Sequence, residues 1–330
     1  GTDDRLEKLS DALHQRVKGQ DGVIDAMIRA VSIAQEGLQV ESKPFGTFLL
    51  LGPTGVGKTE FAKATAQGLF GSEESLIRFD MSEYMEKGDD KKLIGDAKTG
   101  TKGDLTEKVK RRPYSVLLFD EIEKADASVL DLFLQILDDG RLTDATGRLV
   151  SFKNTLVLMT TNLGARKVND QFDIKGDIDK LDNEQLKKLE KNMNRVLKND
   201  LRPEFINRFD YKLIFNVLTE KLILKIVDKD MDLVAQRLAK HGMSVSYDQA
   251  VANYLSRNGT DEKNGARPLA RLISDEVVAP IADLKRRLRR EHGSSAGYHI
   301  IISAVGELKD ESHRKERQHL EFEAILQEVA

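Results

Sequence analysis

Short apolar runs separated by helical patterns fill the first two thirds of the chain. Four runs are continuous enough to be buried strands of a parallel sheet, and they cover residues 47–51, 76–79, 116–119 and 155–159. Helical patterns lie between these runs, most clearly over 58–70 and 128–137. Strands that alternate with helices predict an α/β fold, in which helices cover both faces of a parallel sheet.

The N-terminal segment shows helical spacing as well. Apolar residues recur over residues 11–38, and Gly19 and Gly22 divide this segment into two helices. From Thr219 the pattern changes, because a single apolar stripe predicts one long helix that stops at Gly242.

The remaining third of the chain mixes short elements. We expect a strand over 243–247, two further helices, a strand at 300–302 and a charged terminal helix over 314–329. This change of pattern predicts two domains. The first is a large α/β nucleotide-binding domain over 1–218, and the second is a smaller, mostly helical domain over 219–330.

Composition narrows the class of protein. Of the 330 residues, 40% are hydrophobic and 32% are charged, which is typical of a globular chain. The net charge of −3 argues against a nucleic-acid partner. The chain has no cysteine, which excludes disulfides, thiol catalysis and Cys-based metal sites. No apolar run is long enough for a membrane span and no secretory signal is found, so we expect a cytoplasmic protein without a membrane partner.

A glycine-rich loop joins the first predicted strand to the helix over 58–70. The glycines let backbone N–H groups turn toward a phosphate, and the helix N-terminus adds a favourable potential. Lys58 is expected to reach the β- and γ-phosphates, and the Thr59 hydroxyl to ligate Mg²⁺. The alternative, a glycine-rich turn with a stray lysine, is disfavoured by the strand–loop–helix order. The pattern Gly-x4-Gly-Lys-Thr comprises Gly52, Pro53, Thr54, Gly55, Val56, Gly57, Lys58 and Thr59.

Two carboxylates end the apolar run over 116–119. A P-loop enzyme needs a carboxylate at a strand end to hold Mg²⁺ and a base to orient the attacking water. Asp120 suits the first role and Glu121 the second. An ordinary polar strand end is the alternative, and the neighbouring P-loop makes it the weaker interpretation.

Further polar residues are candidates for the same site. Asn162 follows the fourth predicted strand, where its amide can position water or touch the γ-phosphate, although asparagine is also a common turn residue. Pro268 is typical of a first helical position, so Arg267 starts that helix. A cation is unfavourable there unless an anion lies nearby. For Arg267 and for the arginines of 202–208, a solvated surface is the alternative.

Two other patterns are set aside. Residues 293–297 match Gly-x-Ser-x-Gly, but they follow a predicted helix and precede a strand, which is the reverse of a nucleophile elbow. We expect a turn of small residues there. The six histidines show no metal-ligand spacing, so a zinc site is not expected.

Taken together, these motifs resemble the AAA+ ATPases, and more closely the second ATPase module of the Clp unfoldase and disaggregase family (the ClpA, ClpB and ClpC group). The resemblance extends to about residue 305. Besides the P-loop, it rests on the segments 16–20, 79–87, 111–125, 137–144, 202–208 and 265–269.

The resemblance implies roles for individual residues. Val17 and Lys18 would border the adenine of ATP or ADP, and Asn162 resembles sensor 1. Arg208 resembles the arginine finger that reaches a neighbouring subunit's nucleotide, and Arg267 resembles the sensor 2 that couples the small domain to the γ-phosphate. An arginine supplied in trans implies a ring of identical subunits, normally a hexamer.

Two segments depart from the family pattern. Clp unfoldases present a Gly-aromatic-Val-Gly loop to a central channel, where the aromatic grips the threaded polypeptide. The matching segment here, 93–107, is several residues shorter, and no aromatic residue lies between Tyr84 and Tyr114. Either the grip is made differently, the ring does not translocate, or the loop is altered. Segment 163–202 lacks the tripeptide with which some relatives dock a barrel peptidase, so we expect no such docking.

Three functions are compatible with an ATPase of this kind. The first is a ring that uses ATP hydrolysis to unfold, disaggregate or remodel protein clients. The second is an ATPase switch or assembly factor that does not thread polypeptide, which the missing aromatic favours. A DNA motor is the third, and the negative net charge disfavours it.

Overall fold

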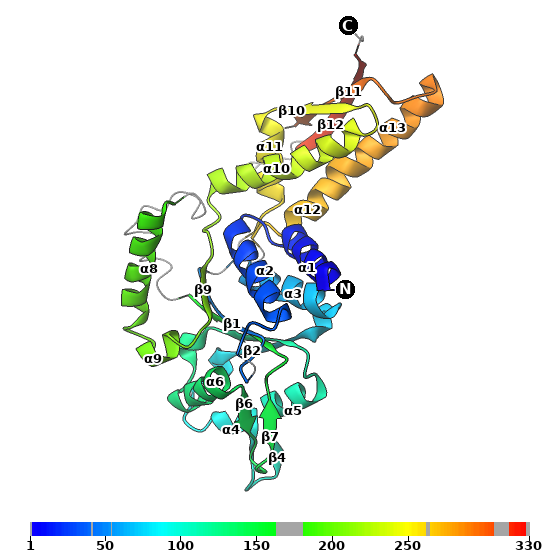
Figure 1. Ribbon diagram of the computed structural model, residues 1–330. Coiled ribbons are helices and arrows are strands. Elements are labelled where there is room, and N and C mark those ends of the chain that lie inside the picture. The colour runs from blue at the N-terminus through cyan, green and yellow to red at the C-terminus, as the bar shows by residue number, and fades with distance from the viewer. Residues whose placement is uncertain are drawn as a thin grey trace. The chain divides into compact units, whose positions relative to one another are not determined.

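The computed structural model describes residues 2–40, 42–53, 55–162, 181–261, 265–306 and 317–327. The chain divides into two compact units, Gly1–Val217 and Leu218–Ala330, and each is described by itself (Figure 1). We call them the first unit and the second unit. No helix in the described ranges is long and apolar enough to cross a membrane.

A five-stranded parallel sheet forms the centre of the first unit, with strand order β2-β5-β8-β1-β9. All residues of β1, β5 and β8 are buried, which explains why they stand out as uninterrupted apolar runs. Because the strands are parallel, their carboxyl ends meet at one edge of the sheet. The strands are β1 (Gly46–Leu51), β2 (Leu76–Asp80), β5 (Val116–Asp120), β8 (Leu156–Thr161) and β9 (Tyr211–Ile214).

Helices cover both faces of this sheet, as predicted. Successive side chains of a strand point to opposite faces, so Phe48 and Leu50 enter one core and Leu49 enters the other. Truncating one such buried side chain to alanine costs about 2–5 kcal/mol of folding free energy. The first face is covered by α1 (Thr2–Arg16), α2 (Asp21–Gln35) and α3 (Lys58–Phe70), and the second by α5 (Asp104–Arg111), α6 (Ala127–Asp139), α8 (Asn183–Leu197) and α9 (Pro203–Ile206).

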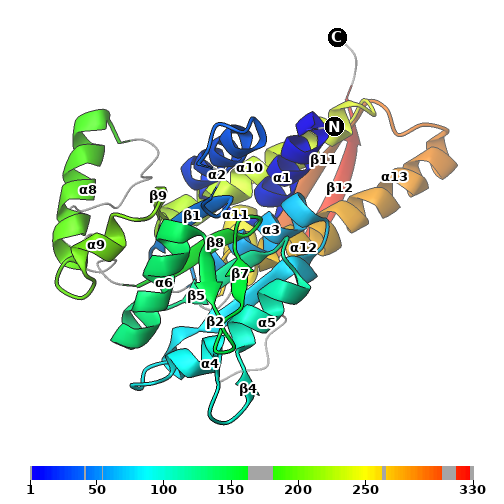
Figure 2. The ribbon, with the colours of Figure 1, turned by 60° about the horizontal axis from the view of Figure 1, so that its bottom comes forward.

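The predicted elements of the first unit are confirmed in most cases. Four strands and the two N-terminal helices form, and the helix predicted over 58–70 is α3 with the same bounds. The sequence analysis missed β9, a short edge strand with one buried residue, Leu213. Two small hairpins were not predicted either. One follows α4 (Asp90–Ile94) and the other follows α6, and the two lie side by side in Figures 1 and 2. The hairpins pair β3 (Gly95–Asp96) with β4 (Thr101–Lys102), and β6 (Arg141–Thr143) with β7 (Leu149–Ser151).

Helices packed against a three-stranded sheet form the second unit. The long helix predicted from Thr219 is α10, which Thr219 caps by accepting a hydrogen bond from the Leu222 N–H. The sheet has the order β10-β11-β12, with β10 parallel and β12 antiparallel to β11. The elements are α10 (Glu220–Ala239), β10 (Ser244–Tyr247), α11 (Gln249–Asn258), α12 (Pro268–Ile273), α13 (Ala279–His292), β11 (Tyr298–Val305) and β12 (His319–Leu326).

The terminal helix predicted over 314–329 is wrong, because His319–Leu326 is strand β12. Leu320, Phe322 and Ala324 alternate with exposed charged residues and pack on the core of the second unit. This period of two matches a strand with one buried face, whereas the high charge of the segment suggested a solvated helix. The expectation for 293–297 is confirmed, since these residues form the turn between α13 and β11.

Candidate functional site

The glycine-rich loop runs from the end of β1 into α3. Gly57 has φ of 108° and immediately precedes Lys58, the first residue of the helix. A Cβ atom on Gly52 would lie only 3.1 Å from the Phe215 Cβ and 3.2 Å from the Val56 Cγ2. The sequence therefore folds here into a tight turn at a helix N-terminus, where backbone N–H groups can bind phosphate. Pro53, Gly55 and Val56 belong to the described loop, and Thr54 lies outside the described residues.

A buried glutamine fixes this loop from a distant part of the chain. The Gln20 side chain is fully buried and donates hydrogen bonds to the Val56 carbonyl (3.0 Å) and the Asn216 carbonyl (2.9 Å). Its own oxygen accepts from the Asn216 N–H at 2.7 Å. Val17 is buried next to the loop, since its Cγ1 lies 3.9 Å from the position of a Cβ on Gly57, and Lys18 follows directly. The predicted adenine-bordering residues thus adjoin the phosphate loop.

Lys58 lies at the centre of the site and is 8% exposed. Its ammonium donates hydrogen bonds to the Gly52 carbonyl, to the Asn162 Oδ1 (2.8 Å) and to the Thr161 carbonyl (3.4 Å). Burial lowers the pKa of Lys58 to about 8, against the opposing charges of Glu123, Asp120 and Glu121. The fold therefore brings the predicted phosphate lysine and Asn162 into direct contact.

Asp120 ends β5 beside this lysine, and it is 8% exposed. Its Oδ1 accepts a hydrogen bond from the Thr160 hydroxyl at 3.1 Å. Its Oδ2 forms an ion pair with the Arg78 Nε at 2.5 Å. A carboxylate, the Thr59 hydroxyl and phosphate oxygens are the hard oxygen donors that Mg²⁺ prefers, so the residues present fit this metal. Within the described ranges, no cluster of three or more His, Cys, Asp and Glu side chains forms a separate metal site.

Glu121 adopts a backbone conformation that non-glycine residues rarely have. Its φ is 57°, and among the described residues it is the one non-glycine residue with positive φ. The Glu121 N–H donates to the Thr160 hydroxyl (3.1 Å), and its carboxylate pairs with Lys124 at 2.7 Å. The hydrogen bond between Lys124 and the Glu121 carboxylate raises the pKa of Lys124. Strain of this kind is found where a side chain has to be held in a set direction at a functional site.

A third carboxylate, Glu123, was not identified from the sequence. Its Oε1 accepts a hydrogen bond from the Asn162 N–H at 3.4 Å, and its Oε2 is buried without a hydrogen-bond partner. A buried, unpaired carboxylate oxygen is costly, and it occurs here beside the buried ammonium of Lys58. Spacing was the available signal, because Glu123 lies two residues after Glu121, in the short 3-10 helix Ile122–Lys124 that follows β5.

The two predicted arginines lie away from this cluster in the sequence and belong to different units. Arg208 follows α9 and pairs with Asp138 at 3.3 Å. No described hydrogen bond or ion pair links Arg208 to the phosphate loop, which is compatible with action on another subunit's nucleotide. Arg267 belongs to the second unit, where it directly precedes Pro268 at the start of α12, as expected.

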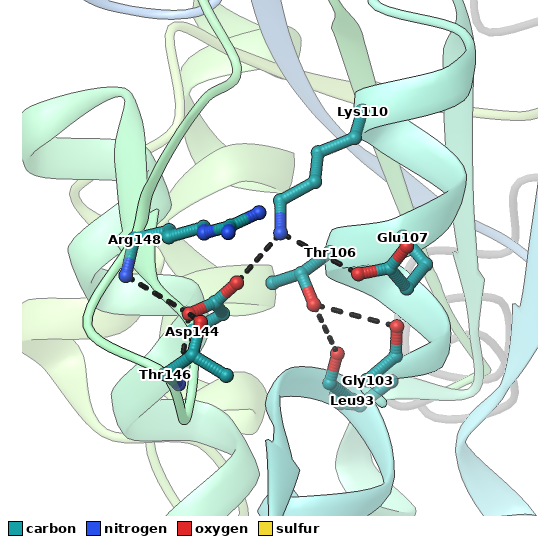
Figure 3. A network of polar contacts seen from close by, with 8 residues as sticks. All are labelled: Leu93, Gly103, Thr106, Glu107, Lys110, Asp144, Thr146 and Arg148. Atoms are coloured by element: carbon teal, nitrogen blue, oxygen red, sulfur yellow. Dashed lines mark hydrogen bonds and ion pairs between the residues drawn. The ribbon is translucent and has the colours of Figure 1, made fainter. Parts of the chain in front are cut away.

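The segment over 93–107, which departs from the Clp pattern, contains the β3–β4 hairpin and leads into α5. Lys110 of α5 reaches Asp144 between β6 and β7 at 2.6 Å and Glu107 at 3.4 Å (Figure 3). Asp144 also accepts hydrogen bonds from the backbone of Thr146 and Arg148, and the hydrogen bond from Lys110 holds its pKa well below the usual range.

Two more hydrogen bonds tie these pieces together. The Ala145 N–H donates to the Ile94 carbonyl at 3.0 Å, which links the turn between β6 and β7 to the start of the β3–β4 hairpin. The Thr106 hydroxyl lies 3.4 Å from the Leu93 carbonyl and 3.3 Å from the Gly103 carbonyl (Figure 3). The shortened segment is therefore closed by its own polar contacts, and it contains no aromatic residue.

The fold and the site define the class of protein. A glycine-rich loop between β1 and α3, carboxylates at the end of β5 and an asparagine after β8 meet at one edge of a parallel sheet. A separate helical unit follows in the chain. This combination is that of a P-loop nucleotide-binding protein of the AAA+ class.

Comparison with known proteins identifies the family. The AAA domain (Cdc48 subfamily) family matches residues 43–212, and the C-terminal, D2-small domain of ClpB protein matches residues 218–294. The chain belongs to the AAA ATPase family and corresponds to the second ATPase module of the Clp proteins.

Individual relatives agree with this assignment. The chaperone protein ClpB of Bacteroides thetaiotaomicron is 44% identical over 309 residues, which cover 92% of this chain and 35% of the relative. The ATP-dependent Clp protease ATP-binding subunit ClpC of Staphylococcus saprophyticus is 42% identical over 286 residues, or 85% of this chain and 35% of the relative. ClpC of Staphylococcus aureus strain N315 is 41% identical over the same length. The chain thus spans about a third of these relatives.

Proposed function

We propose that this chain is an ATP-hydrolysing module that remodels, unfolds or disaggregates protein clients as part of a ring. The observation that supports it most is the contact between Lys58 and Asn162 at the end of β8, next to Asp120 and Glu121. A lysine, an amide and two carboxylates at the end of neighbouring strands are the parts that phosphoryl transfer to water requires.

Each residue has a defined task in this proposal. The phosphate loop from Gly52 to Gly57 binds the phosphates of ATP through its N–H groups, and Lys58 neutralises the β- and γ-phosphates. Thr59 and Asp120 hold Mg²⁺, which supplies charge stabilisation to the phosphates when bound. Val17 and Lys18 border the adenine.

Hydrolysis needs a water molecule in line with the γ-phosphate. Glu121 is the base that orients this water, and its strained backbone is of the kind found at functional sites. The Lys124 ammonium forms an ion pair with the Glu121 carboxylate at 2.7 Å. Asn162, fixed by Glu123, contacts the γ-phosphate or the water.

The proposed ring rests on the resemblance of Arg208 to an arginine finger. We propose that Arg208 completes the site of a neighbouring subunit, and that Arg267 links the small domain over 219–330 to the γ-phosphate. Such arginines accelerate hydrolysis by about 10³–10⁵-fold. A hexamer is the arrangement that the family resemblance implies, while docking to a barrel peptidase is not expected. The segment on which that last expectation rests, 163–202, falls partly outside the described residues.

Two measurements test this function. Replacing Lys58 by alanine is expected to abolish ATP binding in equilibrium titration, and unchanged ATP affinity would refute the P-loop assignment. ATP-dependent unfolding of a tagged model substrate then separates the remodeller from the switch. Unfolding that stops with Glu121→Gln supports remodelling. If ATP is hydrolysed but no substrate is unfolded, the chain is a switch or assembly factor, as the hairpin without an aromatic residue would favour.

A further inference from the structure

The last strand of the second unit has one edge without a strand partner among the described residues. In the order β10-β11-β12, strand β12 pairs with β11 alone. The pairing runs from Tyr298 with Leu326 to Val305 with His319, so β12 is extended over its whole length. Backbone N–H and C=O groups along an open edge can pair with another extended segment.

A groove lined by apolar and charged residues lies between β12 and α13, which runs alongside the strand in Figures 1 and 2. Its volume is about 630 Å³. Pro280 and Leu284 line it from the helix, and Leu320 and Phe322 line it from the strand. Phe322 and Leu320 are half-buried, so part of their surface remains available to a ligand.

Two arginines line the same groove. Arg287 and Arg290 are three residues apart on α13, and Leu284 lies three residues before Arg287, so all three share one face of the helix. Both arginines are exposed, and neither makes a hydrogen bond or ion pair with another residue in the described ranges.

The carboxylates of the groove are already engaged. Asp283 pairs with Arg286, and the Glu321 Oε1 lies 3.1 Å from the His319 Nε2, within hydrogen-bond distance; this contact is an ion pair only when the histidine is protonated. Neither of these pairs includes the two arginines that line the groove. The guanidinium groups of Arg287 and Arg290 are therefore available to an anionic group from outside.

The charge of α13 contrasts with that of the chain. The helix has five cations within 285–290 and two carboxylates, Asp283 and Glu291, whereas the whole chain has a net charge of −3. A second cavity of about 720 Å³, lined by Asp283, Arg286, Arg289 and Arg290, adjoins the groove at Arg290. The positive charge is thus concentrated beside the open strand edge.

We propose that this groove binds an extended acidic polypeptide segment, which adds to β12 as a fourth strand. Alternate side chains of an added strand face the same side, so its recognition pattern is an apolar residue followed by carboxylates at alternate positions. The apolar side chain packs on Leu284 and Phe322, and the carboxylates bind Arg287 and Arg290. Main-chain hydrogen bonds to β12 supply affinity, and the groove supplies selectivity.

Binding of a designed probe tests the proposal on the whole chain. The probe is a fluorescein-labelled peptide of about ten residues with leucine and two glutamates at alternate positions, separated by threonine. We expect fluorescence anisotropy to report saturable binding, and hydrogen exchange to slow at the backbone amides of β12. The double variant Arg287→Glu/Arg290→Glu should weaken binding at least about tenfold.

A matched variant controls for net charge. Arg286→Glu/Arg289→Glu makes the same charge change on the adjacent face of α13, and it should weaken binding less than about threefold. Because none of these residues belongs to the ATP site, unchanged ATP turnover in both variants shows that they fold. Equal losses in the two variants, no binding at about 1 mM probe, or unchanged exchange at β12 would each overturn the proposal. So would displacement of the probe by a single-stranded oligonucleotide at lower concentration than by unlabelled peptide, since that marks a nucleic-acid surface.

Discussion

Two regions of the first unit use charged residues in opposite ways. At the carboxyl edge of the sheet, Lys58 is buried with a lowered pKa, Glu121 has a strained backbone and Glu123 keeps an unpaired oxygen. At the paired hairpins, Asp144 accepts hydrogen bonds from Lys110 and from the turn that surrounds it. Buried charged groups that lack full hydrogen bonding are costly, and they are typical of a site where a ligand binds. Charged groups whose hydrogen bonds are all made stabilise the local structure instead.

This contrast parallels the departure from the Clp pattern. The strand-end residues lie in the motifs on which the resemblance to the Clp family rests, whereas the segment over 93–107, which has no aromatic residue, contains the β3–β4 hairpin. If the first region performs chemistry and the second has a structural role, substitutions in the first should change turnover and those in the second should change stability.

The largest effect is expected from Arg208, if it acts across a subunit interface. Arg208→Ala should lower ATP turnover by about 10³-fold or more, because a transition-state charge loses its partner. Turnover of the unmodified protein should also rise with protein concentration. Arg202→Ala is the matched control, because Arg202 is a similarly exposed arginine of the same segment, paired with Asp131 at 2.9 Å as Arg208 is with Asp138 at 3.3 Å, and its loss should cost less than about tenfold.

Mixing two inactive variants distinguishes action in trans from action in cis. Arg208→Ala retains Glu121, and Glu121→Gln retains Arg208, so a mixed ring contains some complete sites. Turnover above that of either variant alone supports a shared site. No gain on mixing, together with turnover independent of concentration, would show that each chain is self-sufficient.

Glu121 is the next test of the strand-end region. Glu121→Gln should lower turnover by about 10²–10⁴-fold while ATP binding is retained, because the amide cannot act as the base. Glu123→Gln is an equivalent change two residues away, and we expect less than about a tenfold loss, since Glu123 acts through the Asn162 N–H. Single-turnover kinetics measures both. Similar losses in the two variants would mean that the base has been assigned to the wrong residue.

Much of this site can be predicted from the sequence because its parts are local. The phosphate loop, Lys58 and Thr59 lie within eight consecutive residues, and Asp120 and Glu121 follow a strand whose apolar run is unbroken. Neighbouring parallel strands then bring their carboxyl ends together, so Asn162 meets Lys58 as the strand order requires.

The residues that were missed depend on contacts between distant segments. Gln20 holds the loop through Asn216, which is 196 positions away in the sequence. Arg78 reaches Asp120 because β2 and β5 are neighbours, with Asp80 beside Asp120 in register. Strand β12 was misjudged for a different reason, because Leu320, Phe322 and Ala324 alternate with polar residues in the sequence while the high charge of the segment suggested a solvated helix.

A smaller effect is expected from pH, through Lys58. Phosphates favour the charged ammonium, which is present below a pKa of about 8 in the free protein. Above that pH the lysine has to take up a proton before it pairs with ATP, so the affinity should fall about tenfold from pH 7 to about pH 9. Calorimetric titration in buffers of different ionisation enthalpy should detect proton uptake. Affinity that stays flat over this range, with no uptake, would place the phosphates away from Lys58.

The smallest effect on turnover, and a clear effect on stability, is expected at Asp144. Asp144→Asn removes a carboxylate whose pKa is lowered by the hydrogen bond from Lys110, so it should reduce the free energy of unfolding by about 1–3 kcal/mol. Because folding lowers the pKa of Asp144, its contribution to stability is present above the ordinary value of 3.8 and is lost as the pH falls below it.

Asp104→Asn is the control. It breaks an exposed pair with Lys108 on α5, the helix that carries Lys110, and it should change stability by less than about 0.5 kcal/mol. Urea denaturation measures both variants, and ATP turnover should stay within about twofold of the unmodified chain. A large loss of turnover in Asp144→Asn without a loss of stability would mean that the hairpins take part in the ATPase cycle, and the division between the two regions would fail.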